Sequence, residues 1–268
     1  MLNEEDIQEI DRIKPRTVLY MYSGGKDSSL SLLFTRDFIK DYCENNNCRV
    51  YQFYIYITGN THPFNSYASY SVMLYHKKQY NFEIISRAKE KLFQEYMAKY
   101  GLERGSGRWC YNEFKNKVIA EQEKLLPRPI LEIDGMSLGD SKWRAEFLKT
   151  TVESFERNGI KIFGWHPLFN QKLDREEKLK ILEKHEEFKP IIELYKQFGD
   201  SMNCIVCPYK GISKYSKENA VENMYAIGSF TDQALKSYKW KHIFLPTKKK
   251  TLDNFVCDGL CEIDNFNG

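Results

Sequence analysis

The chain has 268 residues, a length that allows one large domain or one domain with a smaller appendage. Its 42% hydrophobic residues are enough for a real core, and the 29% charged and 15% aromatic residues exclude a disordered chain. The 40 basic and 37 acidic side chains nearly cancel. The resulting formal charge of +3 excludes a strong overall field for nucleic acid, although a local basic patch is compatible with it.

The N-terminal residues 1–14, MLNEEDIQEIDRIK, are acidic and amphipathic and lack the pattern of a signal peptide. The sequence also has no apolar run as long as a membrane span. From these two observations we expect a cytoplasmic protein that makes no membrane contact.

A buried strand, a glycine turn and a helix are predicted from residue 17 onward. Residues 17–22, TVLYMY, are β-branched, apolar and aromatic, which predicts a buried parallel strand. Apolar residues then recur at helical spacing over residues 30–38. Between them lies SGGKDSS, residues 23–29, whose two adjacent glycines cost entropy on folding. The start of a helix offers unpaired N–H groups and a positive dipole end, so this turn suits a phosphate.

The turn has neither the GxxxxGK[ST] nor the GxGxxG spacing. It resembles the PP-loop, S-G-G-x-D-S, of the ATP pyrophosphatase superfamily. The resemblance implies that the loop holds the phosphates of ATP, that Mg²⁺ bridges them, and that Lys26 and Asp27 act in catalysis. An ordinary glycine turn capped by Ser or Asp is the alternative. The nucleotide-binding residues that the resemblance implies here are Ser23, Gly24, Gly25, Lys26, Asp27, Ser28 and Ser29.

Residues 50–57, VYQFYIYI, predict a second buried strand, which TGNTHP follows. TGNTHP resembles the D-T-G-x-x-x-P segment of the 3′-phosphoadenylylsulfate (PAPS) reductase-like branch, which implies that Thr58 and Gly59 contact the nucleotide. Ile57 stands where that branch often has Asp. His62 lies in the same segment, at the strand end where such sheets bind ligands.

A helix near residues 66–80 and a third strand near residues 82–85 continue the alternation of strands and helices. This alternation predicts an α/β fold with a doubly wound, mostly parallel sheet. The resemblance implies the adenine nucleotide alpha hydrolase-like (HUP-type) version of that fold.

Two later segments resemble the same PAPS reductase-like family. Residues 107–119, GRWCYNEFKNKVI, resemble R-W-C-T-x-x-x-K. Residues 131–144, LEIDGMSLGDSKWR, resemble x-x-G-x-R-x-x-E-S-x-x-R, with Ser137 in place of an arginine that would contact an anion. The matched residues that the resemblance places on the nucleotide are Arg108, Lys115 and Arg144.

A third segment, residues 194–210, LYKQFGDSMNCIVCPYK, resembles L-Y-x-x-G-x-x-x-x-C-x-x-C-P. The matches together cover most of residues 18–210. They predict a PAPS reductase-like PP-loop nucleotide-binding domain over residues 1–210 and a small, Cys-containing C-terminal extension with a CxxxC motif over residues 211–268.

The seven cysteines are an odd number, which excludes a complete set of disulfides within the chain. Cys204 and Cys207 form a CxxC motif, which suits zinc, an iron–sulfur cluster or a redox dithiol. The resemblance adds Cys110 as a ligand and implies a 4Fe–4S cluster, with Zn²⁺ as the alternative. Tyr111 replaces the second cysteine of the Cys-Cys pair that the related adenylylsulfate reductases use.

Cys257 and Cys261 lie in FVCDGLCEID near the C-terminus. Either one can serve as a fourth metal ligand. Alternatively, one iron of the cluster has no protein ligand and binds a sulfide for delivery. In a third alternative the two thiols are catalytic, like the thiol of the mobile E-C-G-L-H terminus of PAPS reductases. Cys43 and Cys48 lie in a polar connection, YCENNNCRV, and are expected to be free or reversibly paired thiols.

Two charged stretches are expected at the surface. Residues 174–188, DREEKLKILEKHEEF, predict a charge-laced helix with a solvated face and i,i+4 pairs such as Glu176 with Lys180. Residues 236–250, KSYKWKHIFLPTKKK, interleave aromatic residues with lysines, and we favour a snorkelling surface segment over a nucleic-acid contact.

Three functions are compatible with the sequence. The intact loop favours an ATP pyrophosphatase that adenylates a tRNA, a DNA or a small molecule for sulfur transfer from a sulfur donor. The second is a sulfonucleotide (PAPS or adenylylsulfate) reductase, which binds an adenylyl sulfate nucleotide and uses a thiol reductant, with Cys257 or Cys261 as nucleophile. The third is a nucleotide-binding protein with structural zinc.

Overall fold

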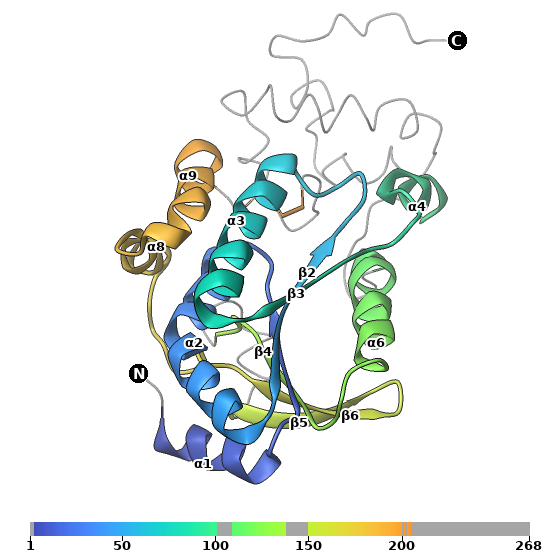
Figure 1. Cartoon of the computed structure of the whole chain (residues 1–268). Coiled ribbons are helices and arrows are strands. Elements are labelled where there is room, and N and C mark those ends of the chain that lie inside the picture. The colour runs from blue at the N-terminus through green and yellow to red at the C-terminus, as the bar shows by residue number, and fades with distance from the viewer. Residues whose placement is uncertain (1–2, 101–108, 138–149, 200, 202, 205–268) are drawn as a thin grey trace, which may run out of the picture.

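The computed structural model describes residues 3–100, 109–137, 150–199, 201 and 203–204. They form an α/β fold in which helices cover both faces of a six-stranded sheet (Figure 1). In the described part of the chain, no helix is long and apolar enough to cross a membrane. The proposed extension over residues 211–268 lies outside the described residues, as do Arg108, Arg144, Cys207, Cys257 and Cys261.

The elements follow the alternation that the sequence predicts. In chain order they are α1 (Glu4–Ile13), β1 (Thr17–Met21), α2 (Lys26–Asn46), β2 (Arg49–Tyr56), α3 (Pro63–Tyr80), β3 (Glu83–Ala88), α4 (Phe93–Tyr100), α5 (Trp109–Tyr111), the π-helix η1 (Asn112–Asn116), α6 (Lys117–Glu123), β4 (Ile130–Ile133), β5 (Val152–Arg157), β6 (Ile160–Trp165), α8 (Arg175–Glu183), the 3-10 helix η3 (Glu186–Phe188) and α9 (Lys189–Phe198). The first three predicted strands and the two helices between them are confirmed.

The strand order is β3-β2-β1-β4-β6-β5, and only β5 runs antiparallel to its neighbour. Val18 of β1 pairs with Val50 of β2 on one side and with Leu131 of β4 on the other. The chain therefore adds β2 and β3 on one side of β1 and then crosses to add β4 on the other side. The strand order reverses at the β1–β4 pair, which is thus a topological switch point. In open α/β sheets, ligands bind outside the carboxyl ends of the strands at such a point.

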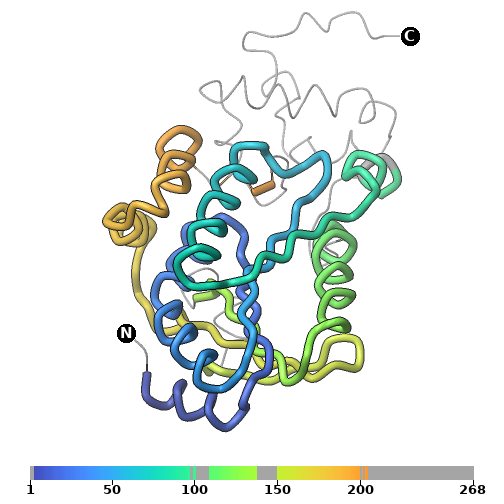
Figure 2. The backbone as a smooth tube through the Cα atoms, viewed as in Figure 1, coloured from blue at the N-terminus to red at the C-terminus, as the bar shows by residue number. Residues whose placement is uncertain are grey.

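Alternating side chains of β1 enter the two layers of the core. Val18 and Tyr20 pack with residues of α2, α3, α8 and α9, whereas Leu19 packs with Val118 and Ile119 of α6. This period of two is the one expected of a strand that is covered on both faces. Figure 2 shows α6 on the opposite side of the sheet from α2 and α3.

The region of residues 174–188 differs from its prediction as a single helix with a solvated face. The chain forms α8, then η3, and leads directly into α9. Lys178 is buried, and the side chain of Glu187 is only 5% exposed because it pairs with Arg36 of α2. Charge content alone did not reveal which face of this segment turns inward.

Arg36 and Glu187 belong to a buried polar group that joins α2, α3 and η3. One guanidinium nitrogen of Arg36 lies 3.1 Å from Nε2 of His76, and the guanidinium lies 5.0 Å from the ring centre of Tyr80. Burial, together with the nearby Arg36, lowers the pKa of His76 to about 4, despite a contact with the Val72 carbonyl. His76 is therefore a neutral core histidine at physiological pH.

Cys43 and Cys48 form a disulfide, with their Cα atoms 4.6 Å apart. It spans the turn between α2 and β2, where Asn47 has the left-handed conformation of a helix C-cap. Of the two states expected from the sequence, the structure therefore shows the paired one.

Candidate functional site

The loop after β1 follows a path that only glycine allows at one position. Gly24 has φ of +69°, and a Cβ there would lie 2.0 Å from the Ser69 hydroxyl of α3. Gly25 is the N-cap of α2 and has no side chain with which to cap the helix. The first N–H groups of α2 thus point out of the carboxyl end of the sheet without a side-chain cap from their own N-cap residue.

The serines hold the loop in this shape. The Ser28 hydroxyl lies 3.1 Å from the Ser23 hydroxyl and donates to the Gly25 carbonyl at 3.1 Å. Ser29 is buried and shares a hydrogen bond of 3.2 Å with the Tyr22 hydroxyl. Ser28 therefore closes the loop, and Ser29 anchors it to the core.

Lys26 and Asp27 belong to a cluster of three charges, which we call the lysine–aspartate cluster (Lys26, Asp27 and Lys178). The Lys26 ammonium lies 2.6 Å from Oδ2 of Asp27, and the Lys178 ammonium lies 2.7 Å from Oδ1. Burial would raise the pKa of Asp27, but the hydrogen bonds from Lys178 and Lys26 outweigh it and bring the pKa below its ordinary value. Asp27 is thus ionised and holds one lysine on each oxygen.

Lys178 is a residue of this site that the sequence did not reveal. It lies in the segment that was expected to be solvated. One signal was present: Lys178 precedes the buried Leu182 by four residues, so the two share the inner face of α8. This spacing places Lys178 on the same face as an apolar residue, but it does not show what that face contacts.

The turn after β4 presses against the loop from the other side of the switch point. A Cβ on Gly135 would lie 2.5 Å from the carbonyl carbon of Asp27 and 2.7 Å from the Ser28 nitrogen, so only glycine allows this contact. The Ser31 hydroxyl donates to the Asp134 carbonyl at 2.7 Å. The first turn of α2 is thereby fixed to the end of β4.

His166, at the end of β6, supports this turn. Its ring nitrogens lie 2.8 Å from the Asp134 carboxylate and 3.3 Å from the Glu153 carboxylate. Burial lowers the pKa of His166, but the two carboxylates outweigh it, so the pKa is raised. The same Asp134 oxygen accepts the Met136 N–H at 2.9 Å, which makes His166 a support of the turn that carries Gly135.

Residues of α9, of the segment after it and of α3 hold the loop through hydrogen bonds. The Lys26 N–H donates to the Tyr195 hydroxyl of α9 at 3.1 Å, so a tyrosine occupies one of the first N–H groups of α2. The Asn203 amide donates to the Ser23 carbonyl at 2.9 Å, and the Asn65 amide donates to the Ser201 carbonyl at 2.7 Å. Residues of α3 and of the segment 195–203, both distant from the loop in sequence, thus meet at the loop.

The second predicted nucleotide segment is held by hydrogen bonds to residues 89 and 94. The Thr58 hydroxyl donates to the Lys89 carbonyl at 3.1 Å, and Gly59 has φ of +83° with its carbonyl accepting from Gln94 at 2.9 Å. His62 is the N-cap of α3 and accepts from the Phe64 N–H. His62 therefore has a structural role as a helix cap, at the same edge of the sheet as the loop.

Two of the predicted metal ligands border the same part of the core. Cys110 and Cys204, 94 positions apart in sequence, pack against the same apolar cluster of Ile57, Phe93 and Phe114. Among the described residues, no group of three His, Cys, Asp or Glu side chains is placed to hold a metal ion. The other predicted thiol ligands are outside the described residues.

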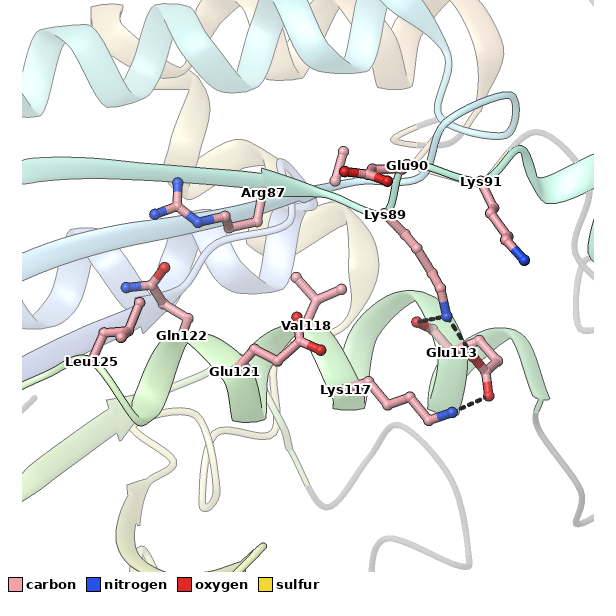
Figure 3. Close-up of a pocket in the computed structure, with 11 residues that line it drawn as sticks. Arg87, Lys89, Glu90, Lys91, Glu113, Lys117, Val118, Glu121, Gln122 and Leu125 are labelled. Carbon is pink, nitrogen blue, oxygen red and sulfur yellow. Dashed lines mark hydrogen bonds and ion pairs between the residues drawn. The ribbon is translucent and has the colours of Figure 1, made fainter.

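A pocket of about 470 Å³ lies between β3 and α6, away from the loop (Figure 3). Glu113 of η1 lies 2.5 Å from both the Lys89 and the Lys117 ammonium groups. These two lysines, Lys117 first, lower the pKa of Glu113 to about 2. Lys115 lies on the same π-helix and is half-buried, and π-helices are frequent at functional sites.

The lysine–aspartate cluster and the α2 N-terminus give the loop the chemistry of an anion site: N–H donors, two ammonium groups and one carboxylate. No protein-family model matches the chain, and no curated protein matches it.

Proposed function

We propose that this chain is an adenine-nucleotide-binding PP-loop enzyme that splits ATP between its α- and β-phosphates and adenylates an acceptor for sulfur transfer. One observation carries the proposal: SGGKDSS runs from the loop after β1 into the first turn of α2, at the carboxyl end of the strand that borders the switch point. In this proposal the sheet is of the adenine nucleotide alpha hydrolase-like (HUP) type and the chain is a PAPS reductase-like member of the superfamily.

The residues of the loop suit the leaving group of such a reaction. An acceptor oxygen attacks the α-phosphorus, the bond to the oxygen that bridges to the β-phosphate breaks, and pyrophosphate leaves with that electron pair. Pyrophosphate is strongly anionic. The N–H groups at the start of α2 and the Lys26 ammonium stabilise the charge that develops on it.

Asp27 has the chemistry of a Mg²⁺ ligand, because Mg²⁺ prefers carboxylate and phosphate oxygens. Both oxygens of Asp27 contact lysines, so a Mg²⁺ ion on this residue would displace one of them. Bound Mg²⁺ would neutralise phosphate charge beside the loop.

Cys110 and Cys204 supply the thiol donors that a zinc ion or an iron–sulfur cluster needs, and both border one apolar cluster. We assign them, with Cys207 and either Cys257 or Cys261, to a 4Fe–4S cluster or to Zn²⁺. When bound, a cluster would supply a site for sulfide or for electron transfer. The two described thiols lie in the same apolar cluster as Ile57, the residue before Thr58.

A sulfonucleotide reductase is the second candidate. The observation in its favour is that the segments around Cys110 and Cys204 resemble the reductases as much as the sulfurtransferases. In that reaction the thiolate of Cys257 or Cys261 attacks the sulfur of the bound adenylyl sulfate, the bond from that sulfur to the phosphate oxygen breaks, and the nucleotide leaves with the electron pair. A thiol reductant then attacks the S-sulfonated cysteine, so that sulfite leaves and a disulfide forms. A protein that only binds nucleotide and structural zinc would do neither.

Two assays on one anaerobic preparation separate these functions. The first follows pyrophosphate release from ATP with tRNA, DNA or sulfate as acceptor, and the proposal expects release that depends on one of them. The second follows sulfite release from adenylyl and phosphoadenylyl sulfate with a thiol reductant. Sulfite that is formed by the wild type and lost in Cys257→Ser or Cys261→Ser would overturn the adenylation proposal.

A further inference from the structure

We propose that Lys178 is a positioning residue of the phosphate loop, which holds the Asp27 carboxylate so that Lys26 is released to an incoming phosphate. This inference rests on the proposed function and adds to it a residue from α8, about 150 positions from the loop, whose ammonium lies 2.7 Å from Asp27. It divides the two lysines of the lysine–aspartate cluster into one that moves and one that stays.

The burial of the two lysines supports this division. The Lys178 side chain is 5% exposed, whereas that of Lys26, the first residue of α2 after the loop, is 20% exposed. A lysine is almost never buried unless it is paired, so Lys178 is held by its bond to Asp27. Lys180, two positions further along α8, is exposed. The orientation of α8 therefore directs one particular lysine to the loop.

The position of α8 is well fixed. Asp174 and Glu177 form a capping box at its start, with the Glu177 N–H donating to Asp174 at 2.9 Å. Leu182, four residues after Lys178, is fully buried in the core that α8 shares with α2. Lys178 thus extends from a fixed helix, as a positioning residue must.

The arrangement matters because a phosphate must compete with Asp27 for Lys26. If Lys26 were the only partner of Asp27, its departure would leave a partly buried carboxylate without a counter-charge, which is costly. With Lys178 in place, Asp27 keeps an ammonium partner after Lys26 has turned to the phosphate. The three side chains also carry a net positive charge, which favours an anion at this end of α2.

The experiment is a double-mutant cycle read by calorimetry with ATP, pyrophosphate and AMP. Lys178→Met preserves length and apolar volume, and Lys180→Met is the matched control on the same helix. We expect Lys178→Met to weaken ATP and pyrophosphate binding about tenfold, the scale of one charge-assisted hydrogen bond, and to change AMP binding less than about twofold. Lys180→Met is expected to bind all three ligands like the wild type.

The Asp27→Asn background separates positioning from direct contact. If Lys178 acts through Asp27, adding Lys178→Met to Asp27→Asn costs less than about twofold in ATP affinity. A tenfold cost that persists in this background would overturn the inference, because Lys178 would then contact the phosphate itself. Lys178→Arg restores the charge and is expected to recover most of the ATP affinity. Lys178→Gln repeats the test if the methionine variant melts early.

The possible failures are distinguishable. A wild type that binds neither ATP nor pyrophosphate would overturn both the proposed function and this inference. A wild type that binds both, together with a Lys178→Met variant that binds them equally well, would overturn the inference alone. An equal loss for ATP and AMP would also overturn it, since that result indicates a general structural defect rather than a phosphate-specific role.

Discussion

Two clusters of three charges lie on opposite sides of the sheet and have opposite compositions. The lysine–aspartate cluster has two cations around one carboxylate, at the carboxyl end of β1. On the side of α6, Arg157 pairs with two carboxylates, Glu123 and Glu132, and we call these three the arginine–glutamate cluster. Both clusters join residues that are distant in sequence, but only the first lies at the switch point of the sheet.

The difference in charge and exposure shows which cluster is suited to a ligand. The lysine–aspartate cluster is partly exposed and has a surplus positive charge, which an anion can neutralise. The arginine–glutamate cluster is buried and has a surplus negative charge. Burial, and the neighbouring Glu132, raise the pKa of Glu123 to about 9, so this cluster removes its surplus by holding a proton. The lysine–aspartate cluster can therefore bind an anion, whereas the arginine–glutamate cluster stabilises the fold.

Loss of Arg157 should have the largest effect. Arg157→Met leaves the buried Glu132 carboxylate without its counter-charge and the protonated Glu123 without its guanidinium partner, so we expect the free energy of unfolding to fall by about 3–5 kcal/mol. Urea unfolding followed by circular dichroism measures this change. Arg87→Met, at an exposed position of β3, is the control and should change the free energy by less than about 0.5 kcal/mol. A loss for Arg157→Met as small as that of the control would contradict a stabilising role for the cluster.

The proton on Glu123 should make stability depend on pH. Its pKa is raised in the folded state from 4.5 to about 9, so the stability that it contributes is fully present below 4.5 and is lost as the pH rises toward 9. Between these values the wild type should lose up to about 1.4 kcal/mol per pH unit from this group. Glu123→Gln should flatten that slope, because an amide needs no proton.

Urea unfolding at pH 5, 7 and 9 tests this dependence. Glu121→Gln, an exposed position on the same helix, serves as the control and should keep the slope of the wild type. If Glu123→Gln and Glu121→Gln show the same slope, Glu123 does not hold the proton.

Removal of Lys26 tests the other cluster. Lys26→Ala deletes the ammonium that is proposed to contact phosphate, so the ATP dissociation constant should rise about tenfold to a hundredfold. Stability should change little, because Asp27 keeps Lys178 as its partner. Calorimetry gives the affinity, and Lys77→Ala, an exposed lysine of α3, is the control. An unchanged ATP affinity would contradict the assignment of this loop to the nucleotide site.

The loop could be predicted from the sequence because its signals are local. A β-branched strand, two glycines and a helical period lie within about twenty consecutive residues, and no long-range contact is needed to interpret them. The hairpin of β5 and β6 also had a local signal, Asn158-Gly159, whose two positive φ angles suit a tight hairpin turn.

Lys178 and Tyr195 could not be predicted in the same way. Their contacts with the loop exist only because α8 and α9 return to α2, over separations of 151 and 169 residues. A helical pattern shows which residues share a face but does not show what that face meets. The three partners of the arginine–glutamate cluster likewise come from a helix and two strands. Long-range packing thus decides which charges are part of a site.

Tyr195→Phe should have the smallest effect on ATP affinity. It tests a single hydrogen bond beside the lysine–aspartate cluster. The Tyr195 hydroxyl accepts the Lys26 N–H at 3.1 Å, and this N–H is one of the donors that a phosphate at the start of α2 would use. Because the variant removes this competitor and leaves the ring in place, ATP affinity should rise about twofold to threefold, while stability falls by about 1 kcal/mol or less. Calorimetry and thermal melting on the same preparation measure both quantities. A lower ATP affinity would show instead that the hydroxyl remains in place and donates to the phosphate.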